Sequence, residues 1–350
     1  MVGQSTRALQ HSLQLLRRKV STWGSGGTVG PHRFSVVNLG LTERCDFHCR
    51  FCHRWKKEGI AALDLDRYRG LIDQLSDYMV PPAKLRLAGG EVLLLPELPE
   101  LVCHASRKGW AVEICTNGWY LDKAMARRLG DCGVALVAVS LDSLDPRVHD
   151  ELRGKPGATE RVLQALEAMG REAPQVHLTL MTLILKQNLF HLVPLVRWAD
   201  AHPHLDGVFF QVLYSNLGDD WRLRHTNEEV RDLLPPPGET SRVLAELAAL
   251  KQAGSAIENE PAQLRTFALY YEEPFRLQRR GPCPLAEDTC VIDEYGMLRF
   301  CPYSEQVAGE VFATPLAELL DSNAAREQKE QMQRCTGTCY SVLNCLFKEE

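Results

Sequence analysis

Residues 34–52 read FSVVNLGLTERCDFHCRFC. The first part, 34–41, is rich in β-branched and apolar side chains, which is typical of a buried strand. Three cysteines, Cys45, Cys49 and Cys52, follow in the adjoining loop. A strand that leads directly into a group of thiols predicts a metal or catalytic site at the end of that strand.

Strand and helix patterns alternate from this point to about residue 212. Six such repeats predict an α/β fold with a parallel sheet, either open or curled into a partial barrel. Ligands in these folds bind beyond the C-terminal ends of the strands, where the cysteines lie. The predicted strands are 34–41, 84–87, 111–115, 134–141, 176–184 and 207–212, and the predicted helices are 66–79, 97–107, 121–130, 159–170 and 189–200.

Composition narrows the class of protein. The chain has 350 residues, of which 45% are hydrophobic and 24% charged, which fits a globular protein of about two domains. A net charge of −5 gives no reason to expect a nucleic-acid partner, and no apolar run is long enough to span a membrane. The N-terminus lacks the uninterrupted apolar segment of a secretion signal, so we expect a reducing, cytoplasmic compartment. Clustered cysteines in that compartment indicate metal binding or catalysis.

Two metals suit the first group of thiols. Three cysteines can hold a 4Fe–4S cluster and leave one iron open for a ligand. Zinc is the alternative, with His48 or His53 as a fourth ligand, although the spacing is not that of a common zinc module.

The spacing Cys-x3-Cys-x2-Cys, with Phe51 before the third cysteine, resembles the radical S-adenosylmethionine (SAM) family. Further segments at strand ends resemble elements of the same family, and the resemblance covers about residues 34–212. A proline often follows the Gly-Gly-Glu element of the family, and here Val92 follows it. The matching segments are Leu87-Ala88-Gly89-Gly90-Glu91, Cys115-Thr116-Asn117-Gly118, Val139-Ser140-Leu141-Asp142 and the Arg153-Gly154 pair.

The resemblance implies a partial (β/α)6 TIM-like barrel that binds SAM at a 4Fe–4S cluster held by the three cysteines. It implies reductive cleavage of SAM and removal of a hydrogen atom from a substrate by a 5′-deoxyadenosyl radical. We expect the paired glycines to let a ligand approach the backbone, Glu91 to accept from an ammonium group and Arg153 to pair with a carboxylate. The expected SAM contacts are Phe51, Gly89, Gly90, Glu91, Thr116, Asn117, Ser140 and Arg153.

Several of these residues also have simpler interpretations. Thr116-Asn117-Gly118 alone is a common turn sequence, and Asp142 and Arg153 can be a cap and a surface charge. We expect Asn188 to begin the helix at 189. Cys103, Cys115 and Cys132 are expected to be buried core thiols.

A second group of cysteines occupies the last part of the chain. Two short β-like runs, Thr289–Ile292 and Met297–Phe300, flank a turn at Gly296 and predict a hairpin. The pattern resembles the SPASM/Twitch extension of radical SAM enzymes and implies at least one auxiliary 4Fe–4S cluster. The full two-cluster pattern has eight cysteines, and this part of the chain has six. A zinc-stapled domain is the alternative. The six candidate ligands are Cys283, Cys290, Cys301, Cys335, Cys339 and Cys345.

Four segments are expected along the chain. Residues 1–33 form a basic amphipathic helix, near 6–22, and a loop; residues 34–234 form the core; 235–282 form a helical connection; and 283–350 form the cluster domain. The N-terminal helix has three interpretations: docking on the core, contact with a membrane surface, or a presequence that would direct the protein to the mitochondrial matrix.

The sequence favours a small molecule or cofactor precursor as substrate. Only about 33 residues precede the first strand, which is short for the peptide-recognition domain that many peptide maturases carry. In addition, Pro302 follows Cys301, where sulfatase-maturing relatives carry an acid. A peptide-modifying SPASM maturase is the alternative. The alternative of another class is a non-enzymatic zinc or iron–sulfur scaffold or electron carrier. A radical SAM enzyme would also need a flavodoxin- or ferredoxin-type electron donor.

Overall fold

The computed structural model describes residues 32–57, 63–213, 228–273, 282–335, 339–345 and 347. The predicted N-terminal helix lies outside the described residues. None of the described helices is long and apolar enough to cross a membrane.

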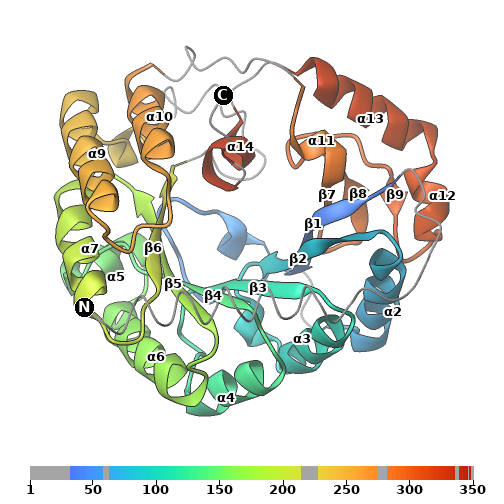
Figure 1. Cartoon of the computed structure of the whole chain (residues 1–350), viewed down its shortest axis with the longest axis horizontal. Helices are drawn as coiled ribbons and strands as arrows, with labels where there is room; N and C mark the ends of the chain where they lie inside the picture. Colours follow the sequence, from blue (N-terminus) through green and yellow to red (C-terminus); the bar gives the residue numbers. More distant parts are fainter. Residues whose placement is uncertain are drawn as a thin grey trace.

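Six parallel strands form a curved sheet that does not close on itself, and the predicted α/β partial barrel is confirmed (Figure 1). Their order in space follows their order in sequence, because each crossover places the next strand beside the last. The strands are β1 (Phe34–Thr42), β2 (Met79–Gly89), β3 (Ala111–Thr116), β4 (Leu136–Ser140), β5 (His177–Ile184) and β6 (Gly207–Val212).

Helices cover the outer face of this sheet (Figure 1). Alternate strand residues such as Val112 and Ile114 of β3 are fully buried in the core that the helices complete. Glu113, between them, lies on the other face and pairs with Lys84 at 2.7 Å and Arg86 at 2.9 Å. The helices of the core are α2 (Leu65–Ser76), α3 (Leu98–Arg107), α4 (Lys123–Asp131), α5 (Pro146–Arg153), α6 (Ala158–Glu172) and α7 (Leu192–Ala201), with the 3-10 turns η1 (Arg54–Lys56), η2 (Val92–Leu94) and η3 (Leu189–His191).

The C-terminal part extends the sheet beyond β1. Strand β7 pairs in parallel with β1. The predicted hairpin is formed by β7 and β8, which pair antiparallel, and β9 adds a further antiparallel strand beside β8. The elements of this part are α8 (Glu228–Leu233), α9 (Pro237–Gln252), α10 (Pro261–Glu272), α11 (Leu285–Asp288), β7 (Thr289–Ile292), β8 (Met297–Arg299), β9 (Gly309–Glu310), α12 (Leu316–Leu320), α13 (Asn323–Arg334) and α14 (Tyr340–Cys345).

Side-chain amides cover the other edge of the sheet, at β6. Asn259 accepts from Phe210 N at 2.6 Å and donates to Phe210 O at 3.0 Å. Asn344 of α14 accepts from Val212 N at 3.0 Å and donates to Val212 O at 3.4 Å. Each amide makes the hydrogen bonds that a neighbouring strand would make. The chain after β6 therefore protects both edges of the six-stranded sheet, β6 with these amides and β1 with β7.

Some helices were not predicted from the sequence. Helix α5 was not predicted because it is short and mostly charged, although Asp145 caps its start and Gly154 ends it in a left-handed conformation. Helix α10 lies in the stretch predicted as a helical connection, whereas α13 lies in the predicted cluster domain, where no helix was expected. Buried apolar residues are few in α13, so the periodic signal there was weak.

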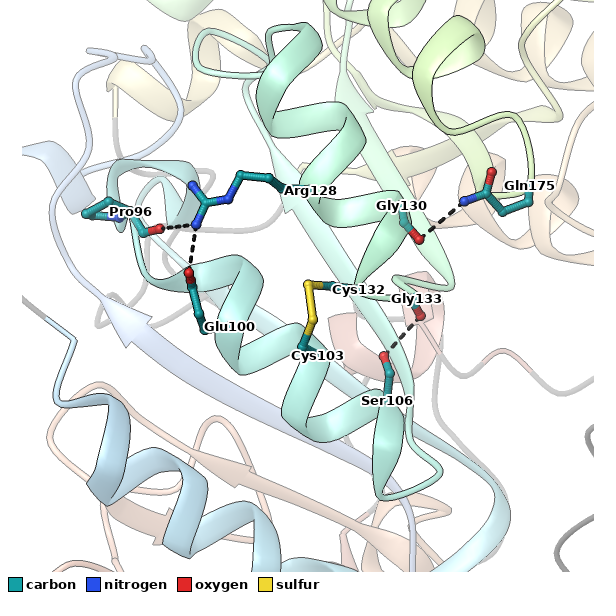
Figure 2. The surroundings of a disulfide bond; sticks show 9 residues. All are labelled: Pro96, Glu100, Cys103, Ser106, Arg128, Gly130, Cys132, Gly133 and Gln175. Carbon is teal, nitrogen blue, oxygen red and sulfur yellow. Dashed lines mark hydrogen bonds and ion pairs between the residues drawn. A yellow bond between two sulfur atoms is a disulfide. The ribbon is translucent and has the colours of Figure 1, made fainter.

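The expectation that Cys103 and Cys132 are separate buried thiols is wrong. The two residues form a disulfide between α3 and the end of α4, and both are half-buried (Figure 2). The same two helices are joined by Arg128, which donates to Glu100 at 2.9 Å and to Pro96 O at 3.3 Å. Sequence separation hid the pairing, because only the packing of neighbouring crossover helices brings these cysteines together.

Candidate functional site

The three cysteines lie in the loop that leaves the C-terminal end of β1. We call residues 43–57 the cysteine loop. Its backbone is bonded to two neighbouring segments: Gly90 N donates to Thr42 O at 2.7 Å and Glu91 N to Arg44 O at 2.8 Å. On the other side, Arg50 N donates to Leu152 O at 3.0 Å. The loop is therefore fixed between the end of β2 and the end of α5.

Glycines make this close approach sterically feasible. A Cβ at Gly89 would lie 2.3 Å from Thr42 O, and a Cβ at Gly90 would lie 2.1 Å from Arg44 O. A Cβ at Gly154 would lie 2.3 Å from His48 O. The paired glycines thus admit the backbone of the cysteine loop, and their contact with a ligand stays a prediction.

Glu91 has a similar structural role at the strand ends. Its carboxylate is 1% exposed and accepts hydrogen bonds from Leu93 N at 3.0 Å, Thr116 Oγ1 at 2.7 Å and Asn117 N at 2.7 Å. Burial raises the pKa of Glu91 to about 7, although these hydrogen bonds oppose the rise. Glu91 therefore braces the ends of β2 and β3, and its contact with SAM stays a prediction.

A second brace starts at Asp46, between the first two cysteines. Asn117 Nδ2 donates to Asp46 Oδ1 at 3.2 Å, and Lys155 Nζ reaches Asp46 Oδ2 at 3.1 Å. The Lys155 ammonium also lies 4.5 Å from the ring centre of Trp119 and 5.6 Å from that of Phe47. Sequence reasoning identified Asn117 but missed Asp46 and Lys155, because an isolated charge carries no pattern.

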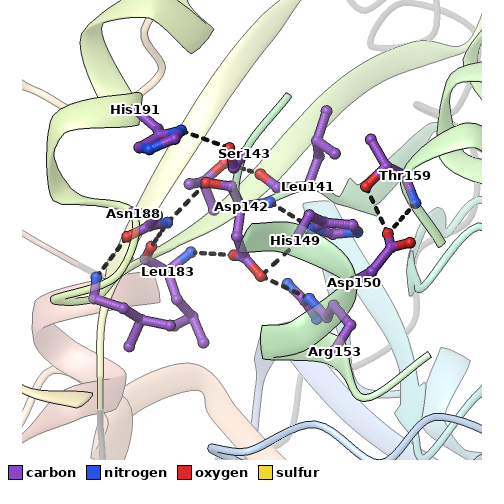
Figure 3. A network of polar contacts seen from close by, with 12 residues as sticks. Leu141, Asp142, Ser143, His149, Asp150, Arg153, Thr159, Leu183, Asn188 and His191 are labelled. Atoms are coloured by element: carbon purple, nitrogen blue, oxygen red, sulfur yellow. Dashed lines mark hydrogen bonds and ion pairs between the residues drawn. The ribbon is translucent and has the colours of Figure 1, made fainter. Parts of the chain in front are cut away.

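Arg153 is held in a buried polar network at the end of β4 (Figure 3). Its Nε donates to Asp142 Oδ2 at 2.7 Å, and both side chains are almost completely buried. The guanidinium lies 5.0 Å from the ring centre of Phe51, and its charge opposes the rise that burial causes in the pKa of Cys49. Neither a surface charge nor a simple cap describes this pair, which connects β4 to the cysteine loop.

The rest of the network orients Asp142. Leu183 N donates to its other oxygen at 3.1 Å, and its own backbone N–H donates to His149 Nδ1 at 3.0 Å. Asn188 is the N-cap residue of η3, as predicted, but its side chain does not cap that turn and donates instead to Asp142 O at 2.8 Å. His149 is fully buried and its Nε2 has no hydrogen-bond partner among the described residues. Ser140, another predicted contact, is buried at the end of β4.

The thiols of the cysteine loop influence one another. Burial raises the pKa of Cys45 to about 12 and that of Cys49 to about 11; Cys49 contributes to the first shift and Cys52 to the second. Among the described residues, no three histidine, cysteine or acidic side chains are close enough to form a metal-ligand set. Three adjacent thiols nevertheless have the donor chemistry for an iron–sulfur cluster, and binding would release their protons.

The C-terminal thiols lie in two different environments. Cys301 lies near Cys283 and Cys335, whose charges raise its pKa after the larger effect of burial. Cys290 is fully buried in β7, and its charged neighbour is Lys329 rather than another thiol. Cys339 is half-buried ahead of α14, and the side chain of Cys345 lies outside the described residues. Cys115 carries a reduced thiol. The prediction that it is buried is wrong, because the residue is exposed.

The curved parallel barrel carries a braced, thiol-bearing loop at the end of its first strand. This is the place where α/β proteins of this class bind their cofactors. Residues 39–199 match the Radical SAM superfamily. This segment is similar to the superfamily, as its motifs predicted, and the similarity implies SAM and a 4Fe–4S cluster as cofactors.

The sequence of the chain is similar to those of two curated proteins. Fe-coproporphyrin III synthase of Methanosarcina barkeri (strain Fusaro / DSM 804) is 30% identical over 52% of this chain and 45% of that protein. GTP 3′,8-cyclase of Brucella abortus (strain S19) is 32% identical over 47% of this chain and 49% of that protein. The chain spans about half the length of these relatives.

Solved structures support the fold of the whole described chain. Streptococcus suis SuiB bound to the precursor peptide SuiA has a TM-score of 0.67 and 14% identity, and the match covers 97% of this chain and 74% of SuiB. At that identity the similarity concerns the fold alone.

Proposed function

We propose that the protein is a radical SAM enzyme whose site is the cysteine loop. The observation that carries the proposal is the position of Cys45, Cys49 and Cys52 on a loop bonded to the ends of β2 and α5, within the segment that matches the superfamily. When bound there, a 4Fe–4S cluster would supply the electron that cleaves SAM to a 5′-deoxyadenosyl radical for hydrogen abstraction from a substrate. A flavodoxin- or ferredoxin-type protein would deliver that electron.

The chain's own residues would hold and orient these groups. The three thiolates would bind the cluster, while Gly89 and Gly90 keep the loop against β2. Phe51, Thr116, Asn117 and Ser140 remain proposed SAM contacts at the strand ends.

Arg153 remains a proposed partner of the SAM carboxylate, and in the structure it also pairs with Asp142. Its Nε is engaged by Asp142, so only its other donors remain for a SAM carboxylate or the Cys49 sulfur. Glu91 would contribute indirectly, because its carboxylate accepts from three donors of its own chain.

The test is SAM cleavage by anaerobically reconstituted protein with dithionite. We expect 5′-deoxyadenosine from the wild type and none from the triple Ala variant of Cys45, Cys49 and Cys52. A Cys103→Ala/Cys132→Ala protein is the matched control, because it loses two cysteines on outer helices and should still cleave SAM. Colourless, zinc-rich wild-type protein would instead favour the non-enzymatic scaffold, and 5′-deoxyadenosine from the triple variant would refute the assignment.

We propose a small molecule or cofactor precursor as substrate. The support is the named chemistry of the sequence relatives, an iron–coproporphyrin synthase and a GTP cyclase. The SuiB complex favours a peptide as the second candidate, although through fold similarity alone. The two are distinguished by candidate substrates from each class: the correct one should increase 5′-deoxyadenosine formation and lose a hydrogen atom. A small peptide gene beside this gene would favour the peptide.

The C-terminal thiols are proposed to hold at least one auxiliary 4Fe–4S cluster. The charges of Cys283 and Cys335 act on Cys301, which supports a shared centre, and Cys290, Cys339 and Cys345 are further candidate ligands. About eight irons per chain would fit one auxiliary cluster and about twelve would fit two, at four irons per cluster.

A further inference from the structure

The turn of the C-terminal hairpin packs directly on the cysteine loop. We call residues 293–296, between β7 and β8, the hairpin turn. A Cβ at Gly40, near the end of β1, would lie 2.8 Å from Glu294 N, so glycine is required for this approach. The pairing of β7 with β1 brings the turn to the same end of the sheet as the three cysteines.

The first contact fixes the loop before Cys45. Glu43 is 3% exposed and its carboxylate has two partners: Tyr295 OH donates to one oxygen, and Lys57 Nζ lies 2.7 Å from the other. A carboxyl group buried to this degree needs both partners, because an unpaired polar group away from water is costly.

The second contact fixes the loop after Cys52. Arg54 Nη1 donates to Glu294 Oε1 in an ion pair whose acid is 5% exposed as a residue. Lys57 adds a connection between the two ends of the loop, because it pairs with Glu43. One short turn thus holds charged residues on both sides of the three thiols.

We propose that the hairpin turn is a clamp on the cysteine loop, with Glu294 and Tyr295 as positioning residues for Cys45, Cys49 and Cys52. This inference rests on the proposed function of the loop. The turn also lies between Cys290 and Cys301, so the clamp would couple the geometry of the C-terminal thiol group to that of the first site. Neither contact was evident in sequence, because the partners are about 240 residues apart.

The test compares Tyr295→Phe and Glu294→Gln with Glu310→Gln in full-length apoprotein. Glu310 is the matched control, because it is an acid of the same C-terminal sheet that pairs with Arg67 of α2 at 3.8 Å and does not reach the cysteine loop. Hydrogen exchange is measured for peptides covering 43–57 and, as an internal reference, β4. We expect exchange in 43–57 to be about tenfold faster in the two clamp variants, with β4 and the control unchanged.

Two outcomes would overturn the clamp. Exchange in 43–57 could match the wild type, or it could rise equally in β4, which would mean general destabilisation. Since the readout uses apoprotein, it is independent of the proposed function: wild-type protein that binds no iron at the loop would defeat the enzyme proposal while the exchange result stood.

A spectroscopic readout separates positioning from simple docking of two domains. The change that SAM produces in the electron paramagnetic resonance spectrum of the reduced protein reports on a cluster with an open iron. We expect this change to be smaller in Tyr295→Phe and Glu294→Gln than in Glu310→Gln at equal iron content. An identical SAM-induced change in all three variants would contradict a positioning role.

Discussion

Asp142 and Arg153 form a charge pair with almost no contact with solvent; their residues are 0% and 7% exposed. Removing one charge of such a pair leaves the other buried without compensation. We predict that Asp142→Asn lowers the free energy of unfolding of the apoprotein by about 3–5 kcal/mol. Denaturant titration measures the loss.

Asp145→Asn is the control for this change. Asp145 caps α5 and pairs with Arg147 at the surface, and asparagine caps a helix equally well. Its effect should stay within about 0.5 kcal/mol. Equal costs for the two substitutions would show that the buried pair has no special weight.

His149 should make stability depend on pH. Burial lowers its pKa to about 4, with the Arg153 charge adding to the effect and Asp142 and Asp150 opposing it. Between this value and the ordinary pKa of 6.5 the unfolded chain binds the extra proton, so stability is fully present above 6.5 and falls as pH decreases toward 4. Between pH 7 and pH 5 the wild type should lose about 2 kcal/mol more than His149→Gln. Parallel pH profiles from denaturant titrations would exclude this linkage.

Among the structural elements, the junction of β2 with the cysteine loop depends on a glycine. A methyl group at Gly90 would lie 2.1 Å from a backbone oxygen, which cannot move without displacing the loop. We predict that Gly90→Ala costs about 1–3 kcal/mol and reduces iron uptake at the loop. Gly70→Ala in α2 is the control, since nothing lies within 4 Å of its new methyl group and alanine favours a helix. Reconstituted iron content and unfolding free energy are the measurements, and equal behaviour of the two variants would argue against the steric explanation.

The edge of β6 depends on two amides. Asn344→Ala removes a donor and an acceptor that satisfy both backbone groups of Val212, which are buried. The predicted cost is about 1–3 kcal/mol, because the abandoned groups lose their partners away from water. Gln164→Ala removes an amide bonded to Glu160 at the surface and should cost under about 0.5 kcal/mol. Thermal unfolding of the two variants compares them, and a similar Tm would rule out edge protection.

At the scale of the whole molecule, the two thiol groups belong to different parts of the chain. Cys45, Cys49 and Cys52 follow β1, whereas Cys283, Cys301 and Cys335 surround the C-terminal hairpin and α13. We predict that the triple Ala variant at the first group retains the iron of the second. Iron and zinc analysis of that variant checks the result, and a variant that bound zinc and no iron would refute the auxiliary cluster.

Sequence alone determined the six-stranded α/β barrel, the place of the first thiol group and the similarity of residues 39–199 to the superfamily. These depend on local information: a period of two in strands, the spacing of cysteines in one loop, and short motifs at strand ends. The disulfide, the Asp142–Arg153 pair, the role of Gly89 and Gly90 and the hairpin turn were decided by the tertiary structure. Each joins segments that only the parallel crossovers and the β1–β7 pairing bring together, and a side chain's partner across such distances leaves no periodic signal in the sequence.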